Sequence, residues 1–141
     1  MRWALLIAGL LVLALAGAVA EAEGATLEPT VEVDILTLTT IDWKPGDELP
    51  KSVRDLSGKR VVIRGYMHGS IDEETRRFPF VSDSCQCTAR LMPHHFVDVL
   101  VDEETAPIAG QFEIIGRLNV GPRLDDDGFV TSVYRLKGEI Y

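Results

Sequence analysis

The sequence predicts a small, mainly β domain: a partly closed barrel of the OB type with five or six strands and one short helix, or alternatively a small β-sandwich. Three observations support this prediction. Apolar and polar residues alternate with period two in several short segments. Stretches rich in Gly, Pro, Asp and Ser separate these segments at regular spacing. The length that follows an apolar N-terminus suits one domain with one core.

The first predicted strand has a break in its pattern. Val31–Ile35 alternates apolar with acidic residues, which predicts a half-buried strand. The phase then slips, because Leu36 and Leu38 are the next apolar residues. Either a bulge lies near Ile35, or the second half of the strand is buried on its opposite face.

The next segment predicts a connector, a helix and a second strand. Residues 42–49 are rich in turn formers, and Pro50 can open a short helix that runs to Leu56 and stops at Gly58. Residues 58–67 then alternate, with Val61, Ile63 and Gly65 on one face.

Four more strands follow. Residues 70–77 predict a hairpin-type loop, and residues 103–110 and 119–128 predict further connectors. A glycine inside a strand, as at Gly65 or Gly116, suits a bulge or a tight corner of a barrel. The predicted strands are 78–81 (broken at Pro79), 96–101, 111–118 and 129–140.

The N-terminus has the pattern of a secretory signal peptide. Arg2 precedes an apolar stretch from Leu5 to Leu15, and Ala18-Val19-Ala20 matches a cleavage site. A transmembrane anchor is the competing interpretation, but the apolar run is short for one. We therefore expect residues 1–20 to be a signal peptide, 21–29 a disordered leader and 30–141 a single OB-like domain. The protein is then exported, periplasmic or secreted, with no stable membrane anchor after cleavage.

The charge limits the class of partner. The chain carries a formal net charge of −8, and cleavage after Ala20 would remove Arg2 but no acidic residue. Contact with phosphates requires a basic surface, so we expect no nucleic-acid partner. The acidic balance is compatible with cations or with a basic partner.

Six parts of the chain stand out by their order: Trp43, residues 58–67, Phe78–Val81, the cysteine loop, Tyr134 and Ile140. This order resembles an exported bacterial family, domain of unknown function 3299 (DUF3299). The resemblance covers roughly Ile41 to Tyr141. It implies a small OB-like exported domain without an established enzymatic activity, and some relatives are similar to proteins that accompany metal-uptake or ABC-type export systems. The cysteines depart from the family, whose members often carry adjacent cysteines or one cysteine before a proline-rich stretch.

Soft and borderline metal ligands gather in the segment Ser84–Phe96, SCQCTARLMPHHF. Thiolate and imidazole suit zinc and copper, and two sulfurs spaced Cys-x-Cys can reach one ion from a loop. Adjacent histidines in a regular strand point to opposite faces, so only one of the pair would share the ion unless Pro93 keeps the segment irregular. The predicted ligands are Cys85, Cys87, His94 and His95, with Met67, His68 and Met92 as further candidates.

Two other interpretations of the cysteines stay open. Paired cysteines in an exported protein usually form a disulfide, although a Cys-x-Cys ring is small and strained, so intermolecular pairing is an alternative. A strained disulfide is easier to reduce, which allows thiol-redox chemistry. Redox enzymes, however, normally place Cys-x-x-Cys at the start of a helix.

The sequence therefore predicts an exported, non-enzymatic binding module that holds zinc or copper as an accessory to metal handling or ABC-type transport. The alternative is a metal-free interaction module whose partner is an envelope transporter or another envelope protein. A thiol-redox protein is the one enzymatic alternative. Asp98 would face solvent from its strand, or would orient an imidazole if it faced the cysteine loop.

Overall fold

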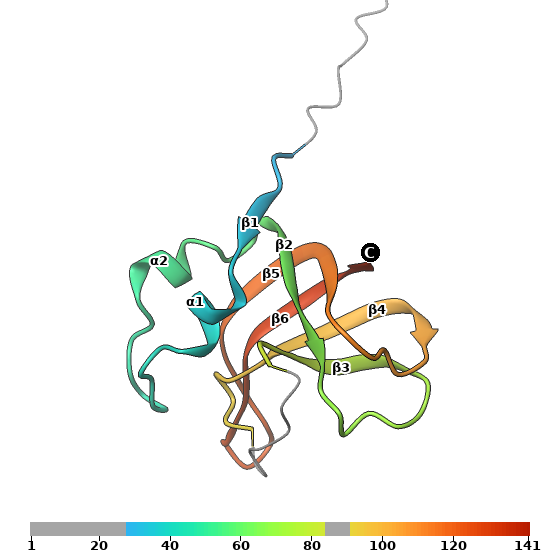
Figure 1. Ribbon diagram of the computed structural model, residues 1–141. Helices are drawn as coiled ribbons and strands as arrows, with labels where there is room; N and C mark the ends of the chain where they lie inside the picture. Colours follow the sequence, from blue (N-terminus) through green and yellow to red (C-terminus); the bar gives the residue numbers. More distant parts are fainter. Residues whose placement is uncertain (1–27, 84–90) are drawn as a thin grey trace, which may run out of the picture.

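The computed structural model describes residues 28–83 and 91–141 (Figure 1). The predicted signal peptide, most of the predicted leader, and both Cys85 and Cys87 lie outside the described residues. Within the described ranges, no helix is long and apolar enough to cross a membrane. The elements found there are β1 (Val31–Val33), α1 (Ile35–Thr39), α2 (Lys51–Arg54), β2 (Arg60–Met67), β3 (Thr75–Val81), β4 (Val97–Thr105), β5 (Phe112–Leu124) and β6 (Val130–Ile140).

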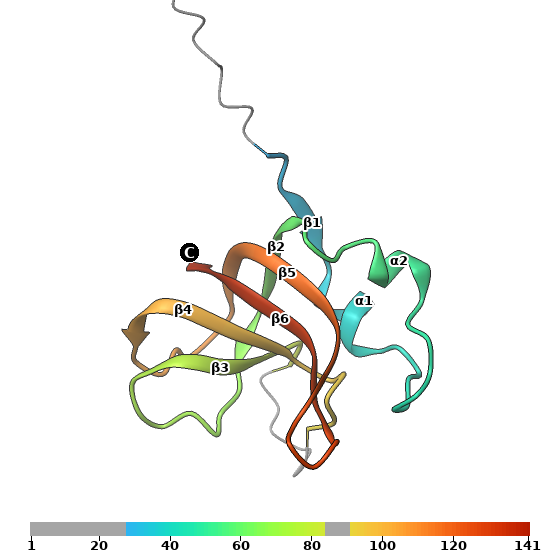
Figure 2. The ribbon, with the colours of Figure 1, turned by 180° about the vertical axis from the view of Figure 1, so that it is seen from behind.

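Five of the strands close into a ring (Figures 1 and 2). Antiparallel pairs join β2 to β3, β3 to β4, β6 to β5 and β5 to β2, while β4 and β6 run parallel. β1 pairs in parallel with β2 outside the ring. The ladder between β2 and β3 has only two residue pairs, so the barrel is partly closed. This single sheet confirms the predicted small, mainly β barrel and excludes the two-sheet sandwich.

The first predicted strand is wrong in its second half. It ends at Val33, and a short helix, α1, replaces the predicted bulge or change of face. The Asp34 side chain caps this helix by accepting a hydrogen bond of 2.9 Å from the backbone N–H of Leu36. Helical spacing then buries Ile35 and Leu38 together, which explains the slip in the alternating pattern.

The helix and strand that follow lie where they were predicted, although α2 ends at Arg54, two residues before the predicted end at Leu56. α2 begins directly after Pro50, and the chain reverses at Gly58 with φ +81°, a conformation that favours glycine. In β2, Val61 and Ile63 are fully buried. A Cβ at Gly65 would lie 2.6 Å from the carbonyl oxygen of Val81. Gly65 stands where the ladder of β2 with β5 ends and the ladder of β2 with β3 begins, so it is a tight corner of the barrel.

Three later strands are longer than predicted. β3 begins at Thr75 and continues through Pro79, whose carbonyl accepts a hydrogen bond from the His68 N–H at 2.9 Å. The nitrogen of Pro79 faces β2, as its carbonyl does. The β2–β3 ladder ends there with the pair Met67 and Phe80, so the missing N–H of Pro79 interrupts no ladder. β4 extends to Thr105 through the predicted connector. β5 extends to Leu124, with register shifts between Val120 and Leu124 where Gly and Pro interrupt the regular pairing.

The core fills the ring and extends under the two helices. Tyr134 is fully buried, and its hydroxyl donates a 2.7 Å hydrogen bond to the carbonyl oxygen of Leu38 in α1. This bond ties the segment before the barrel to its last strand. The largest fully buried side chains are those of Tyr134, Phe78, Phe80, Leu38, Ile63, Ile114, Leu118 and Leu136.

Candidate functional site

A hollow of about 250 Å³ contains two of the predicted candidate ligands, His68 and His95. We call it the histidine hollow. Its walls also include Asp83 and Leu91, the described residues on either side of segment 84–90. The described residues that flank the cysteine-containing segment therefore both line this hollow. The described residues that line it are Thr39, Thr40, His68, Val81, Ser82, Asp83, Leu91 and His95.

His68 is held at the end of β2 in one tautomer. Its Nδ1 atom lies 3.2 Å from the backbone nitrogen of Ser70 and 2.9 Å from the hydroxyl of the same residue. A backbone N–H can only donate, so Nδ1 is the acceptor and the proton of the neutral ring is on Nε2. His68 would bind a metal through Nε2 only after this proton moved, which makes it the weaker of the two histidines that line the hollow.

His94 faces the protein interior. The residue is only 7% exposed, and its ring packs edge-on against Trp43 with the centroids 5.7 Å apart. Burial lowers the pKa of His94 most, and the neighbouring His95 lowers it further, whereas Asp42 acts to raise it. Its Nδ1 atom is buried and has no hydrogen-bond partner among the described residues. Burial therefore favours the neutral form of His94, and the residue belongs to the packing around Trp43.

His95 is exposed and lines the hollow. It lies in a turn rather than a strand, because β4 begins at Val97 and the His95 N–H donates to the Met92 carbonyl at 2.9 Å. The two histidine rings are 4.3 Å apart at their centroids, in edge contact. Strand alternation therefore does not separate this pair, since the segment around Pro93 is irregular. They differ in burial instead, with His94 inside and His95 at the surface.

The two methionines are placed apart from the hollow. Met67 is 8% exposed and belongs to the hydrophobic core, and Met92 is 43% exposed. Neither is among the residues that line the histidine hollow. Within residues 28–83 and 91–141, no group of three or more His, Cys, Asp or Glu side chains could hold a metal ion. A metal at the hollow would therefore need ligands from segment 84–90.

Asp98 is engaged by an arginine on the outer face of the barrel. Its carboxylate accepts hydrogen bonds from Arg77 Nε at 2.9 and 3.1 Å, and Arg77 Nη2 contacts it as well. Its side chain is 11% exposed, so the predicted solvent-facing position is in fact covered. The carboxylate holds Arg77 and lines no part of the histidine hollow.

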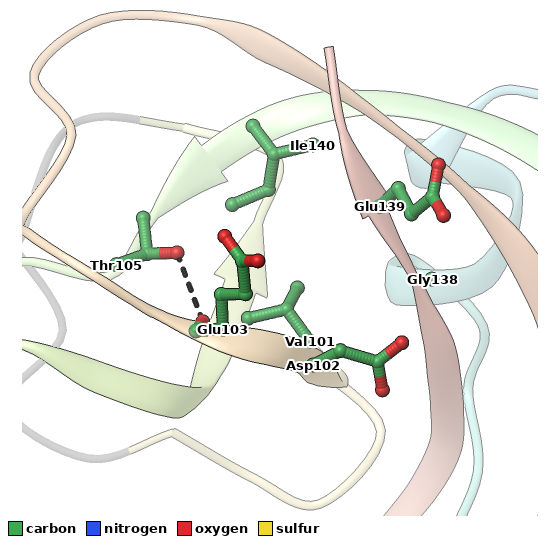
Figure 3. Close-up of a pocket in the computed structure, with 7 residues that line it drawn as sticks. All are labelled: Val101, Asp102, Glu103, Thr105, Gly138, Glu139 and Ile140. Atoms are coloured by element: carbon green, nitrogen blue, oxygen red, sulfur yellow. Dashed lines mark hydrogen bonds between the residues drawn. The ribbon is translucent and has the colours of Figure 1, made fainter.

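A second hollow, of about 410 Å³, lies between the ends of β4 and β6 (Figure 3). It has three carboxylates in its lining, from Asp102, Glu103 and Glu139. Figure 3 shows Glu103 beside Ile140, whereas the side chains of Asp102 and Glu139 extend away from Glu103. The carboxylates do not converge on one point, so this hollow does not have the geometry of a cation site.

Six lining residues of the histidine hollow were not predicted as site residues, and four of them are polar: Thr39, Thr40, Ser82 and Asp83. Thr39 and Thr40 lie at the end of α1, a helix that the alternating pattern concealed, and both hydroxyls donate to carbonyls one turn earlier. Asp83 directly precedes segment 84–90. The short spacing from Asp83 to Cys85 is the one sequence signal that could have placed it near the predicted ligands.

These observations define a class of protein: a small five-stranded β-barrel with a polar, histidine-lined hollow. A crystal structure of a DUF3299 family protein from Pseudomonas aeruginosa PAO1 has the same fold. Its TM-score is 0.53 at 14% sequence identity, over 79% of this chain and 95% of that chain. At this identity the similarity concerns the fold alone. No protein-family model matches the sequence, and no curated protein matches it.

Proposed function

We propose that this chain is an exported, non-enzymatic binding module of the DUF3299 family, with an OB-type barrel. It holds one transition-metal ion, zinc or copper, through Cys85, Cys87 and His95. Its biological role is then accessory to metal handling or ABC-type transport in the cell envelope. The similarity in fold to the Pseudomonas protein supports the family part of this proposal.

One observation carries the metal site: His95 lines the same hollow as Asp83 and Leu91, the described residues on either side of segment 84–90. Cys85 follows Asp83 by two residues, and an extended chain spans at most about 7 Å over that separation. Chain connectivity therefore supports a proposal in which the first cysteine can reach the wall of the hollow. Sulfur and imidazole together suit zinc and copper, which is the chemistry expected of such a set.

The burial of the two histidines selects one of them. His94 is packed against Trp43 and lies inside, whereas His95 is exposed at the hollow. Turning His94 outward would expose an apolar surface of Trp43, which is only 3% exposed. His95 is therefore the imidazole ligand of this proposal. His68, which also lines the hollow, is the candidate for a fourth ligand, and it must first change its tautomer.

Thiol counting on untagged, unreduced mature protein tests this proposal. A metal-bound pair becomes reactive toward a thiol reagent after a chelator is added, without a reductant. A pair that reacts only after reduction would overturn the metal site and support the metal-free interaction module with a disulfide. Catalytic exchange of the pair with a glutathione buffer would support the thiol-redox alternative instead.

A further inference from the structure

A basic cluster occupies the outer face of β3, β4, β5 and β6, although the chain as a whole is acidic. Four cationic side chains surround a hollow of about 140 Å³, together with one carboxylate, Asp98, and the apolar Leu100 and Leu136. We call this surface the basic face. Its cations are Arg77, Arg123, Arg135 and Lys137.

Strand register brings these residues together. Arg77 is paired with Leu100 across β3 and β4, and Leu100 is paired with Lys137 across β4 and β6. Asp98 is paired with Arg135 in the neighbouring row. Directly paired residues have their Cβ atoms about 5 Å apart, so the charged groups are close neighbours. The parallel contact between β4 and β6, visible in Figure 2, is what joins residues distant in sequence.

The positive charge of this face is only partly balanced. The Asp98 carboxylate is already occupied by Arg77. Arg135 Nη1 donates to neutral acceptors, the Gly121 carbonyl at 2.9 Å and the Ser132 hydroxyl at 3.4 Å. Burial lowers the pKa of Arg135 most, and repulsion by Arg123 and Arg77 lowers it further. Attraction to Asp98 acts in the opposite direction. An additional anion would therefore be stabilised here by several cations at once.

The protein itself provides an example of a carboxylate bound in the adjoining position. Lys137 is paired with Arg117 across β6 and β5, so Arg117 continues the row of Arg77, Leu100 and Lys137. Arg117 binds the carboxylate of Glu28 through both terminal nitrogens, with Nη1 at 3.1 Å. Glu28 precedes β1, in a segment without helix or strand structure.

We propose that the basic face is a docking surface for an acidic, extended segment of a partner protein. Carboxylates of that segment bind Arg123, Arg135 and Lys137, and an apolar side chain covers Leu100, which is 44% exposed. The segment lies over Arg123, Arg135 and Lys137, where Asp98 is the one carboxylate of the lining. This surface shares no residue with the histidine hollow and does not depend on metal binding.

Fluorescence anisotropy on the mature chain tests the proposal, with a hexaglutamate peptide carrying a neutral dye as the probe and hexaglutamine as its control. The double variant Arg123→Gln/Lys137→Gln removes two cations of the basic face. Among the hydrogen bonds and ion pairs of the described residues, none joins either side chain to a carboxylate. The matched control is Lys44→Gln/Lys51→Gln, which removes the same charge from exposed positions in the connector and α2.

We expect hexaglutamate to bind, hexaglutamine not to bind, and added NaCl to weaken the complex. The basic-face variant should raise Kd about fivefold or more, and the control variant by less than about twofold. Absence of hexaglutamate binding to the unaltered chain would overturn the proposal. So would equal losses in both double variants, or tighter binding of an oligothymidylate of equal charge. The salt titration needs no variant, so the proposal stays testable if a variant fails to fold.

Discussion

The imidazole of His94 lies edge-on to the indole of Trp43, with the ring centroids 5.7 Å apart. This contact divides two adjacent histidines into different roles. His94 is part of the packing and His95 is available at the surface of the histidine hollow. The proposed metal site depends on this division, and the first prediction tests it.

Replacing His95 should weaken metal binding, and replacing His94 should not. We expect His95→Ala to lower the affinity for zinc by at least about tenfold, because even the loss of a hydrogen-bonding partner of a ligand costs that much. His94→Phe keeps an aromatic ring against Trp43 and should change the affinity by less than about threefold. Competition with a chromophoric chelator measures both variants. Equal affinities of the unaltered chain and His95→Ala would show that His95 is not a ligand.

The buried position of His94 predicts an acid-sensitive fold. Its pKa in the folded state is lowered, chiefly by burial, below the value of about 6.5 expected in the unfolded chain. As pH falls below about 6.5, the unfolded state binds a proton that the folded state binds less well, so the free energy of unfolding decreases. This contribution is fully restored above the unfolded pKa.

Urea denaturation between about pH 8 and pH 5 measures this effect, in a Cys85→Ser/Cys87→Ser background to exclude metal. His94→Phe in the same background should show a smaller loss of stability on acidification. If the free energy of unfolding depends on pH in the same way in both proteins, burial does not lower the pKa of His94 in the folded state.

The hydroxyl of Tyr134 is predicted to stabilise the junction between α1 and the barrel. It donates a 2.7 Å hydrogen bond to the buried carbonyl of Leu38, and burial raises its pKa to about 12. Tyr134→Phe leaves that carbonyl unsatisfied and should cost about 1–3 kcal/mol in the free energy of unfolding. The matched control is Tyr141→Phe, at a residue that is 63% exposed, with an expected change below about 0.5 kcal/mol. Similar losses in both variants would contradict a specific role for the Leu38 contact.

Gly116 is predicted to be irreplaceable for lack of space. A Cβ there would lie 2.2 Å from the Lys137 carbonyl oxygen and 2.5 Å from the Gly138 Cα, and neither backbone atom can move independently of its strand. Gly116→Ala should therefore destabilise the barrel by more than about 2 kcal/mol. Gly46 has φ +97°, and a Cβ added to it would meet no atom within 4 Å, so Gly46→Ala should cost only about 1–2 kcal/mol. Thermal denaturation ranks the two, and the reverse order would contradict the observed approach of β5 and β6.

The sequence predicts those parts of the fold that local patterns determine. Alternation identifies β2 and β6, and Pro50 and Gly58 mark the limits of the α2 region. It does not reveal α1, because a single helical turn buries Ile35 and Leu38 without a longer periodic pattern. Pro79 suggests a break in β3, but the consequence of a missing N–H depends on where the neighbouring ladder ends, which is a tertiary property.

The candidate sites show the same limit. Cys85, Cys87 and the two adjacent histidines stand out as metal-ligand types, and only packing against Trp43 distinguishes His94 from His95. His68 and His95 line one hollow because the ends of β2 and β3 meet there. The basic face is harder to recognise in the sequence, because Lys137 lies beside Leu100 only through the parallel pairing of β4 with β6. An acidic total charge conceals such a cluster.

The proposed metal site is tested most directly by the metal content of mature protein purified without a histidine tag, compared with that of its Cys85→Ser variant. We expect about one zinc or copper ion per chain in the unaltered protein and a loss of that ion in the variant, because the described residues alone provide no group of three ligands. Substoichiometric metal that Cys85→Ser leaves unchanged would contradict the proposed metal site.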